Sequence, residues 1–146
     1  GYDTELGIIL KQCRELGFKP DFYASAGAVS NKLLEIAQQG AEVLVCATAP
    51  FNAGSEEPHI KSFVSAFTEE YGEPPDWLAA NSYDAVDIIA HILNGGARSG
   101  EEIKNGLYAT KDFPGVSGNT TFDEFGEVVK PIELMIVKDG QFTPFK

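Results

Sequence analysis

The side chains best suited to acid–base or metal chemistry are two histidines, and each stands near acidic residues. His59 follows Glu56 and Glu57, and His91 comes one helical turn after Asp87. Spacings of this kind give exposed ion pairs on helix surfaces. A zinc site or a catalytic triad needs several groups that converge on one point, and neither histidine has a second histidine at ligand spacing. We therefore interpret both histidines as solvent-exposed, with no metal-binding or catalytic role.

The two cysteines, Cys13 and Cys46, lie in apolar stretches of the sequence. Cys13 shares a helical face with Leu6 and Leu10, and Cys46 ends the strand-like run Val43-Leu44-Val45. We interpret both as free, buried thiols, which is a common setting of cysteine outside disulfides. A Cys13–Cys46 disulfide in an oxidising compartment is the alternative. Neither cysteine is expected to act as a nucleophile.

Three short segments have compositions found in ligand loops. Gly115-Val116-Ser117-Gly118 is not followed by a helix start, as phosphate cradles require, so we expect a turn there. Residues 123–127, DEFGE, are acidic but depart from the calcium-loop pattern, and residues 119–121, NTT, match a glycosylation acceptor. We expect a capped turn and the polar start of a strand, respectively. Since no acid, base or nucleophile converges with another, we expect neither enzymatic activity nor a bound cofactor.

The composition excludes some partners. The chain has 146 residues, 43% of them hydrophobic, with a formal charge of −11. That charge argues against nucleic acid or an anionic membrane as a partner, because both select clustered Lys and Arg. No apolar run approaches the roughly 20 residues of a membrane span, and no signal peptide is recognisable. Because the chain starts at Gly1, a trimmed product is expected.

The longest helical signal covers residues 77–96. Asp76 is the predicted N-cap, and Gly95-Gly96 should end the helix. Its apolar residues recur at separations of three, four or seven, which predicts an amphipathic helix. The predicted buried face comprises Ala79, Val86, Ile89, Ala90 and Leu93, and the predicted solvent face comprises Asp84, Asp87, His91 and Asn94.

The other elements alternate between helix and strand near the N-terminus. We expect a helix over 6–16, capped by Asp3 or Thr4, and a second over 31–39, capped by Ser30. Strands are expected over 21–25 and 41–48, which indicates an α/β layer architecture. A helix from Pro58 should bury Ile60, Phe63, Val64 and Phe67. Later strands are predicted over 120–122, 132–137 and 141–145, the last two joined by a turn at Asp139-Gly140.

The stretch from Trp77 onward resembles the C-terminal half of the type I periplasmic ligand-binding proteins of ABC transporters, the leucine/isoleucine/valine-binding family. The residues that carry the likeness are Ser82-Tyr83-Asp84-Ala85-Val86, Ser99-Gly100, residues 113–118 and residues 122–126. The resemblance implies a fold of two three-layer α/β/α lobes with the ligand between them, and a chain that lacks the N-terminal half. By this likeness, residues 1–49 belong to the second lobe, 50–130 to the first, and 131–146 form a hairpin returning to the second.

The resemblance also implies where the ligand binds. Open α/β sheets bind ligands at the carboxyl ends of their strands. Tyr2 matches the family's cleft aromatic residue, and Ser25, Ala26 and Gly27 follow a predicted strand. The amino-acid-binding members carry an acidic residue near the position of Ala26, where it pairs with the ligand's ammonium group. We therefore expect a small-molecule ligand that lacks a free ammonium group, such as a carboxylate, an amide or an aromatic acid.

The resemblance predicts a solute-binding component of an ABC importer, with the membrane permease as partner. It would capture a small molecule, an amino acid or a related carboxylate, amide or aromatic acid, in the cleft between the lobes by hinge closure. The location would be periplasmic or extracellular, with a lipid anchor in a Gram-positive source. A ligand-sensing regulatory or receptor module is the alternative, and a small α/β enzyme ranks last. Because helices outnumber strands, we expect exposed apolar stripes and association with another chain or a second copy. The predicted stripes contain Ile60, Phe63, Val64 and Phe67, and Ile88, Ile89 and Ile92.

Overall fold

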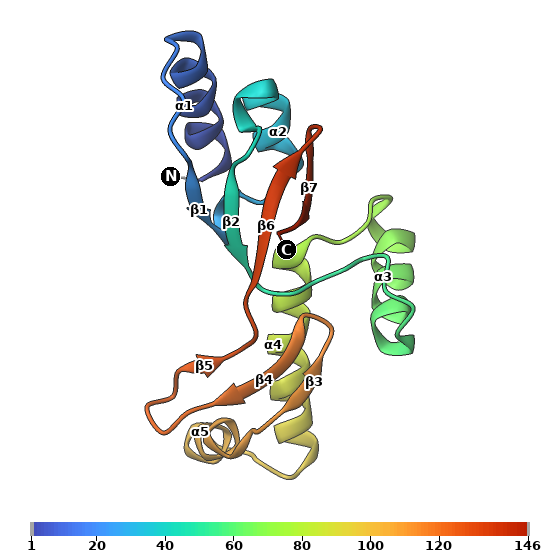
Figure 1. Cartoon of the computed structure of the whole chain (residues 1–146). Coiled ribbons are helices and arrows are strands. Elements are labelled where there is room, and N and C mark those ends of the chain that lie inside the picture. Colours follow the sequence, from blue (N-terminus) through green and yellow to red (C-terminus); the bar gives the residue numbers. More distant parts are fainter. Residues whose placement is uncertain (1, 146) are drawn as a thin grey trace. The chain divides into compact units, whose positions relative to one another are not determined.

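The chain folds into two units in the computed structural model, which describes residues 2–145. Unit 1 comprises residues 1–48 and 132–146, and unit 2 comprises residues 49–131. Figure 1 shows the helices and strands of each. Within the described residues, no helix combines the length and apolar character needed to cross a membrane.

Unit 1 is a four-stranded sheet with helices packed against it. Its strands are β1 (Tyr23–Ser25), β2 (Val45–Thr48), β6 (Glu133–Lys138) and β7 (Gln141–Pro144), in the order β1-β2-β6-β7. β1 and β2 are parallel, whereas β6 is antiparallel to both of its neighbours. The helices α1 (Asp3–Glu15) and α2 (Asn31–Ala37) enclose the core, which includes Leu10, Leu33, Leu44, Cys46 and Val137. The mixed α/β architecture predicted from the sequence is confirmed.

The predicted cap of α1, Asp3 or Thr4, was wrong, and the helix begins three residues earlier than expected. Tyr2 is the N-cap, without a side-chain cap hydrogen bond, and Asp3 is the first helical residue. On the helical face that Cys13 shares with Leu6 and Leu10, only Leu10 is fully enclosed, and the other two are partly buried. Ser30 caps α2 as predicted, since its hydroxyl accepts a hydrogen bond from the Leu33 amide at 3.1 Å.

The predicted hairpin between β6 and β7 is confirmed. Its two turn residues, Asp139 and Gly140, have φ of 52° and 72°, the left-handed values that a tight hairpin turn requires. The Glu42 carboxylate accepts hydrogen bonds from the amides of Asp139 at 3.2 Å and Gly140 at 2.7 Å. The loop before β2 is thereby tied to this turn.

Unit 2 contains three helices and a three-stranded antiparallel sheet. The helices are α3 (Pro58–Tyr71), α4 (Trp77–Asn94) and α5 (Gly100–Ala109). The strands are β3 (Phe113–Gly115), β4 (Gly118–Phe122) and β5 (Val128–Val129), in the order β3-β4-β5. The sequence analysis missed β3 and β5. The turn expected at residues 115–118 joins β3 to β4.

The predicted faces of α4 were wrong in part: Asp87, His91 and Asn94 are exposed as expected, but the buried face differs. The buried residues are Ala80, Asp84, Ile88 and Ile92, spaced four apart, whereas Val86 is 70% exposed. Asp84, which we expected in solvent, is 2% exposed. Its carboxylate is buried because backbone amides and a lysine from elsewhere in unit 2 supply its hydrogen bonds.

The apolar stripes expected to be exposed are largely buried within unit 2. Phe63 packs against Ala80 and Val116, and Ile60, Val64 and Phe67 pack around this cluster. Ile88 and Ile92 are 4% and 9% exposed. The α4 residue Ile92 lies so close to Gly106 of α5 that a Cβ there would come within 2.5 Å of its Cγ2.

Candidate functional site

Two of the four predicted ligand-binding residues lie in contact in unit 1. The Tyr2 ring packs against Gly27, where an added Cβ would lie 3.2 Å from its Cδ1. Tyr2 is nevertheless 76% exposed, so one side of the ring lies against the backbone of Gly27 and much of the rest faces solvent. An aromatic ring with a hydroxyl provides an apolar wall and a hydrogen-bonding group for a small ligand.

Ser25 and Ala26 occupy the carboxyl end of β1. Ser25 is the last residue of β1 and pairs with Ala47 of the parallel strand β2. It occupies the N-cap position of the 3₁₀ turn Ala26–Ala28, without a capping hydrogen bond from its side chain. The four predicted residues therefore come from two segments, Tyr2 from the start of α1 and residues 25–27 from the end of β1 and the turn after it. Their side chains offer one ring, two hydroxyls and no charge.

A polar link missed by the sequence analysis holds this region together. The Ser30 hydroxyl donates to Asp3 Oδ2 at 3.3 Å, and the Thr4 amide donates to Asp3 Oδ1 at 2.7 Å. These hydrogen bonds lower the pKa of the Asp3 carboxyl, and the bond from the Thr4 amide has the largest effect. The positive charge of Lys32 lowers this pKa further. The link joins the start of α1 to the N-cap of α2, and its residues Asp3 and Ser30 follow Tyr2 and Gly27 closely in the sequence. Only the small polar residue types at these positions signalled it.

The histidines and cysteines do not converge on a common site. His59 Nδ1 lies 3.9 Å from a Glu57 carboxylate oxygen, with both side chains exposed. His91 packs edge-on against Phe113, with ring centroids 5.6 Å apart. Cys13 is partly buried and Cys46 fully buried, and both are free thiols.

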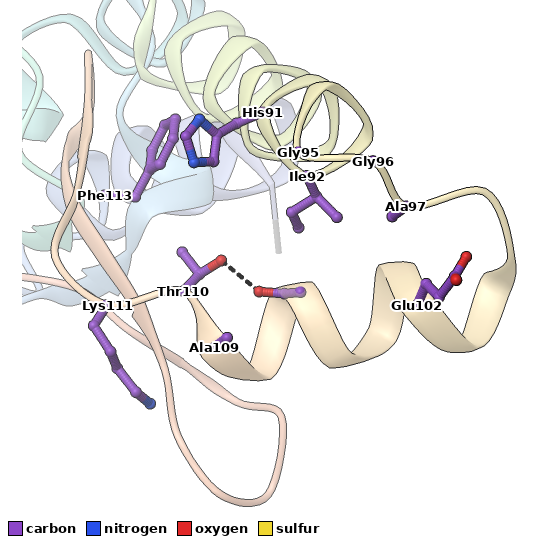
Figure 2. A pocket seen from close by; sticks show the side chains of 11 residues that line it. His91, Ile92, Gly95, Gly96, Ala97, Glu102, Ala109, Thr110, Lys111 and Phe113 are labelled. Carbon is purple, nitrogen blue, oxygen red and sulfur yellow. Dashed lines mark hydrogen bonds between the residues drawn. The ribbon is translucent and has the colours of Figure 1, made fainter.

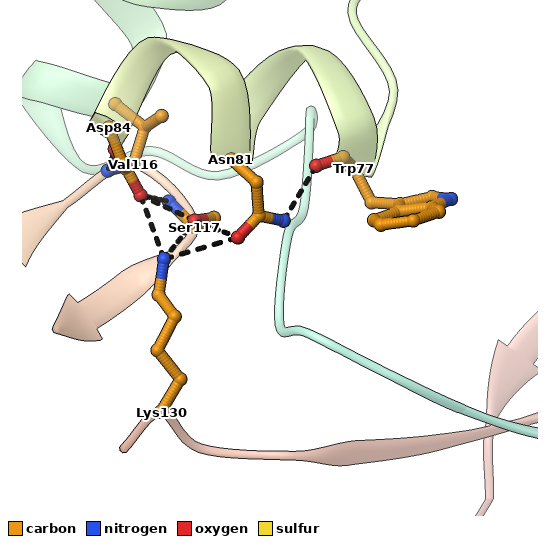
Figure 3. A network of polar contacts seen from close by, with 6 residues as sticks. All are labelled: Trp77, Asn81, Asp84, Val116, Ser117 and Lys130. Atoms are coloured by element: carbon orange, nitrogen blue, oxygen red, sulfur yellow. Dashed lines mark hydrogen bonds and ion pairs between the residues drawn. The ribbon is translucent and has the colours of Figure 1, made fainter. Parts of the chain in front are cut away.

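Unit 2 contains a buried polar network around Asp84 (Figure 3). The carboxylate accepts hydrogen bonds from the amides of Val116 at 2.7 Å and Ser117 at 3.0 Å, and from the Ser117 hydroxyl. Lys130 Nζ lies 3.1 Å from Asp84 Oδ2, with the two side chains 14% and 3% exposed. Lys130 Nζ also donates to Ser117 Oγ at 2.5 Å and to Asn81 Oδ1 at 3.3 Å. The Asp84 charge is balanced by the Lys130 ammonium group and by the two amide donors. The network therefore holds the β3–β4 turn against α4.

A cavity of about 550 Å³ lies beside the C-terminal end of α4 and α5 (Figure 2). Three polar side chains in its wall, those of Glu102, Thr110 and Lys111, have hydrogen-bond partners within the fold. Glu102 accepts the amides of Arg98 and Ser99, Thr110 Oγ1 donates to the Gly106 carbonyl at 2.9 Å, and Lys111 donates to the Phe122 carbonyl. These groups cap helix ends and strands, so they do not make a preformed ligand site.

Comparison with known proteins shows the family. The family sequence model described as periplasmic binding protein matches residues 4–141. The chain is 30% identical over 129 residues to the leucine-, isoleucine-, valine-, threonine- and alanine-binding protein of Pseudomonas aeruginosa, a match covering 88% of this chain and 34% of that protein. It is also 30% identical over 128 residues to the Leu/Ile/Val-binding protein of Escherichia coli K12, with the same coverage. The chain thus spans about a third of the length of these relatives.

Solved structures give the same result. A leucine binding protein from Thermotoga maritima superposes with a TM-score of 0.86 at 33% identity, covering 100% of this chain and 42% of that chain. The branched-chain amino acid transporter substrate binding protein of Streptococcus pneumoniae, solved with isoleucine, gives 0.83 at 30% identity, covering 97% and 41%. Both likenesses confirm the type I periplasmic binding protein fold, of which the chain covers about two fifths. The chain belongs to the periplasmic binding protein family.

Proposed function

We propose that this chain forms part of a solute-binding protein that captures a small molecule for an ABC importer. The observation that carries the proposal is the similarity over residues 4–141 to a family whose relatives are amino-acid-binding proteins. Capture would occur by hinge closure between two lobes. A ligand that contacts both lobes favours the closed form, and only that differential affinity shifts the open–closed equilibrium.

In this proposal, residues 1–49 and 131–146 belong to one lobe and residues 50–130 to the other. The division of the chain into units at residues 48–49 and 131–132 supports this assignment. The family further suggests a periplasmic or extracellular location and the importer's membrane permease as partner.

The proposed ligand-binding residues are Tyr2, Ser25, Ala26 and Gly27. The Tyr2–Gly27 contact supports grouping them, as does their place at the carboxyl end of β1. Because Ala26 supplies no carboxylate, an ammonium group at this position would lose its water without gaining a charged partner. We infer that the ligand is a small carboxylate, amide or aromatic acid without a free ammonium group.

Calorimetric titration of the genome-encoded protein that contains this chain tests both proposals. The ligand pair is leucine and 4-methylpentanoic acid, which keeps the side chain and carboxylate of leucine but lacks the ammonium group. We expect tighter binding of the acid. Ala26→Glu should then raise the affinity for leucine about tenfold or more, since a hydrogen bond to a charged group contributes roughly 1.5–3 kcal/mol.

Ala85→Glu, at an exposed position of α4, is the matched control and should change neither affinity. Submicromolar leucine binding by the unmodified protein would contradict the inferred selectivity. If neither compound nor a wider set of acids, amides and amino acids binds, the solute-binding proposal itself is wrong.

A further inference from the structure

The chain passes between the two units at two places, and the flanking residues of unit 2 lie close together. One crossing is at residues 48–49 and the other at 131–132. Pro50 follows the first, and Lys130 and Pro131 precede the second. These three residues belong to unit 2, so their contacts lie within one unit.

Both prolines pack against the same residue of the β3–β4 turn. A Cβ on Gly118 would lie 3.1 Å from Pro50 Cγ and 3.9 Å from Pro131 Cδ. Gly118 has φ of +92°, a conformation that favours glycine. The two chain segments that leave unit 2 therefore pack against one turn.

This turn is itself fixed to α4 by the buried network. Asp84 holds the amides of Val116 and Ser117, and Lys130 bridges Asp84, Ser117 and Asn81 (Figure 3). Lys130 is thus both a partner of the buried carboxylate and the residue next to Pro131. Its ammonium group ties the second crossing to a helix of unit 2.

The same two segments are also neighbours within unit 1. Thr48, at the end of β2, pairs with Glu133, at the start of β6. Each pair of flanking segments is therefore held together on both sides of the crossings. Only residue 49, on the first segment, and residue 132, on the second, lie between the paired strands of unit 1 and the packed prolines of unit 2.

We propose that Lys130 is a positioning residue that fixes where both crossings leave unit 2, so that movement between the units is confined to the few residues beyond it. Hinge residues are commonly a few positions at the ends of elements that absorb the change in backbone angles. The use of this arrangement in ligand capture rests on the proposed function. The restriction of movement to the residues beyond Lys130 does not depend on any ligand.

Spin-label distance measurements on the 146-residue chain test the proposal. In a background carrying Cys13→Ala and Cys46→Ala, one label pair at Lys32 and Glu101 reports on distances between the units. A second pair at Glu69 and Glu101 reports on distances within unit 2; these three positions are exposed. Because Lys130→Met alone leaves Asp84 buried without its cation, the double variant Asp84→Asn/Lys130→Met is measured beside it.

We expect both variants to broaden the Lys32–Glu101 distance distribution, which reports on the two units. In the double variant, the Glu69–Glu101 distribution within unit 2 should stay as narrow as in the unmodified chain. Lys61→Met removes an exposed ion pair with Glu56 in the same unit and should leave both distributions unchanged. An unchanged distribution between the units in the double variant would overturn the proposal. So would equal broadening within unit 2, since Lys130 would then serve only the fold. No ligand is added, so the result is separate from that of the titration.

Discussion

At the scale of single residues, the buried Asp84 carboxylate leaves no room for a side chain at Gly115. A Cβ there would lie 2.3 Å from Asp84 Oδ2 and 2.5 Å from its Cγ. Glycine is required at this position for space, because the neighbouring carboxylate is held by several hydrogen bonds and cannot move aside. The requirement follows from a contact between residues 31 positions apart in sequence.

Gly115→Ala should therefore destabilise unit 2 by on the order of 1–3 kcal/mol, the usual cost of overpacking. Urea unfolding followed by circular dichroism measures the change in free energy. Gly100→Ala is the control, because a Cβ at Gly100 meets nothing within 4 Å. Alanine in that first turn of α5 should be neutral or stabilise by up to about 1 kcal/mol. Equal effects of the two substitutions would refute the steric explanation.

Cys46 provides a second prediction at this scale. Burial raises the pKa of its thiol from 9.0 to about 11. Below pH 9 the thiol is protonated in both the folded and the unfolded chain, so its full contribution to stability is present. Between about pH 9 and 11 the unfolded chain loses the proton first, which favours unfolding by roughly 2–3 kcal/mol in total.

Unfolding free energies of the wild-type chain and of Cys46→Ala, measured from pH 8 to 11, isolate this contribution. The wild-type advantage over the variant should shrink as the pH rises through this range. A difference that stays constant with pH would show that the thiol does not titrate as its burial implies.

At the scale of elements, α5 is held at its start by a reciprocal pair of hydrogen bonds. The Ser99 hydroxyl accepts the Glu102 amide, and the Glu102 carboxylate accepts the Ser99 amide. The Glu102 carboxylate also accepts hydrogen bonds from the Arg98 amide and the Ser99 hydroxyl. The Arg98 amide, followed by the hydroxyl and amide of Ser99, lowers the pKa of this carboxyl. The stabilisation is present above the ordinary pKa of the carboxyl and is lost as the pH falls through the lowered value.

Ser99→Ala should cost about 1 kcal/mol, since it removes the oxygen that accepts the Glu102 amide. The loss should appear as faster hydrogen exchange of the first-turn amides of α5. Ser82→Ala, at an exposed position within α4, is the matched control and should not reduce stability. If α5 exchanges at the same rate in both variants, the capping pair does not stabilise the helix.

Features encoded by neighbouring residues could be predicted from the sequence, whereas distant contacts could not. The caps Ser30 and Asp76 and the Asp139-Gly140 turn were correct because each acts within a few residues. Asp84 was assigned to the wrong face of α4 because its partners are residues 116, 117 and 130, which no periodicity reveals. β5 was missed because a strand of two residues has no detectable alternation.

The same limit applies to the proposed ligand site. Tyr2 and Gly27 were grouped from the family resemblance and lie in contact. The Asp3–Ser30 hydrogen bond beside them joins residues 27 positions apart, and nothing local to either residue indicates it.

At the scale of the whole molecule, the apolar surface differs from the one expected. The predicted stripes of α3 and α4 are mostly enclosed, but large apolar side chains on other faces of both units are exposed. They include Leu16 at 85%, Val86 at 70% and Ile132 at 74%. Exposed apolar surface of this kind favours association, at roughly 25 cal/mol for each Å² removed from water.

Sedimentation velocity of the 146-residue chain over a range of concentrations tests whether this surface is covered by another copy. We expect species larger than the monomer that increase with concentration. Val86→Ser, which makes one exposed apolar position polar, should reduce association without loss of helix content. A monomer at every concentration would contradict this expectation.

The arrangement of unit 1 has a consequence for the order in which the chain acquires its structure during synthesis. Its sheet places β6 between β2 and β7, so a strand near the C-terminus lies in the interior of a layer begun near the N-terminus. Unit 2, by contrast, is continuous from residue 49 to residue 131. On the ribosome, unit 2 can therefore fold before unit 1 is complete. Until residues 133–144 emerge, the edge of β2 that pairs with β6 has no partner strand. This unpaired edge of β2 is where a chaperone, or β6 of another copy, would bind the nascent chain.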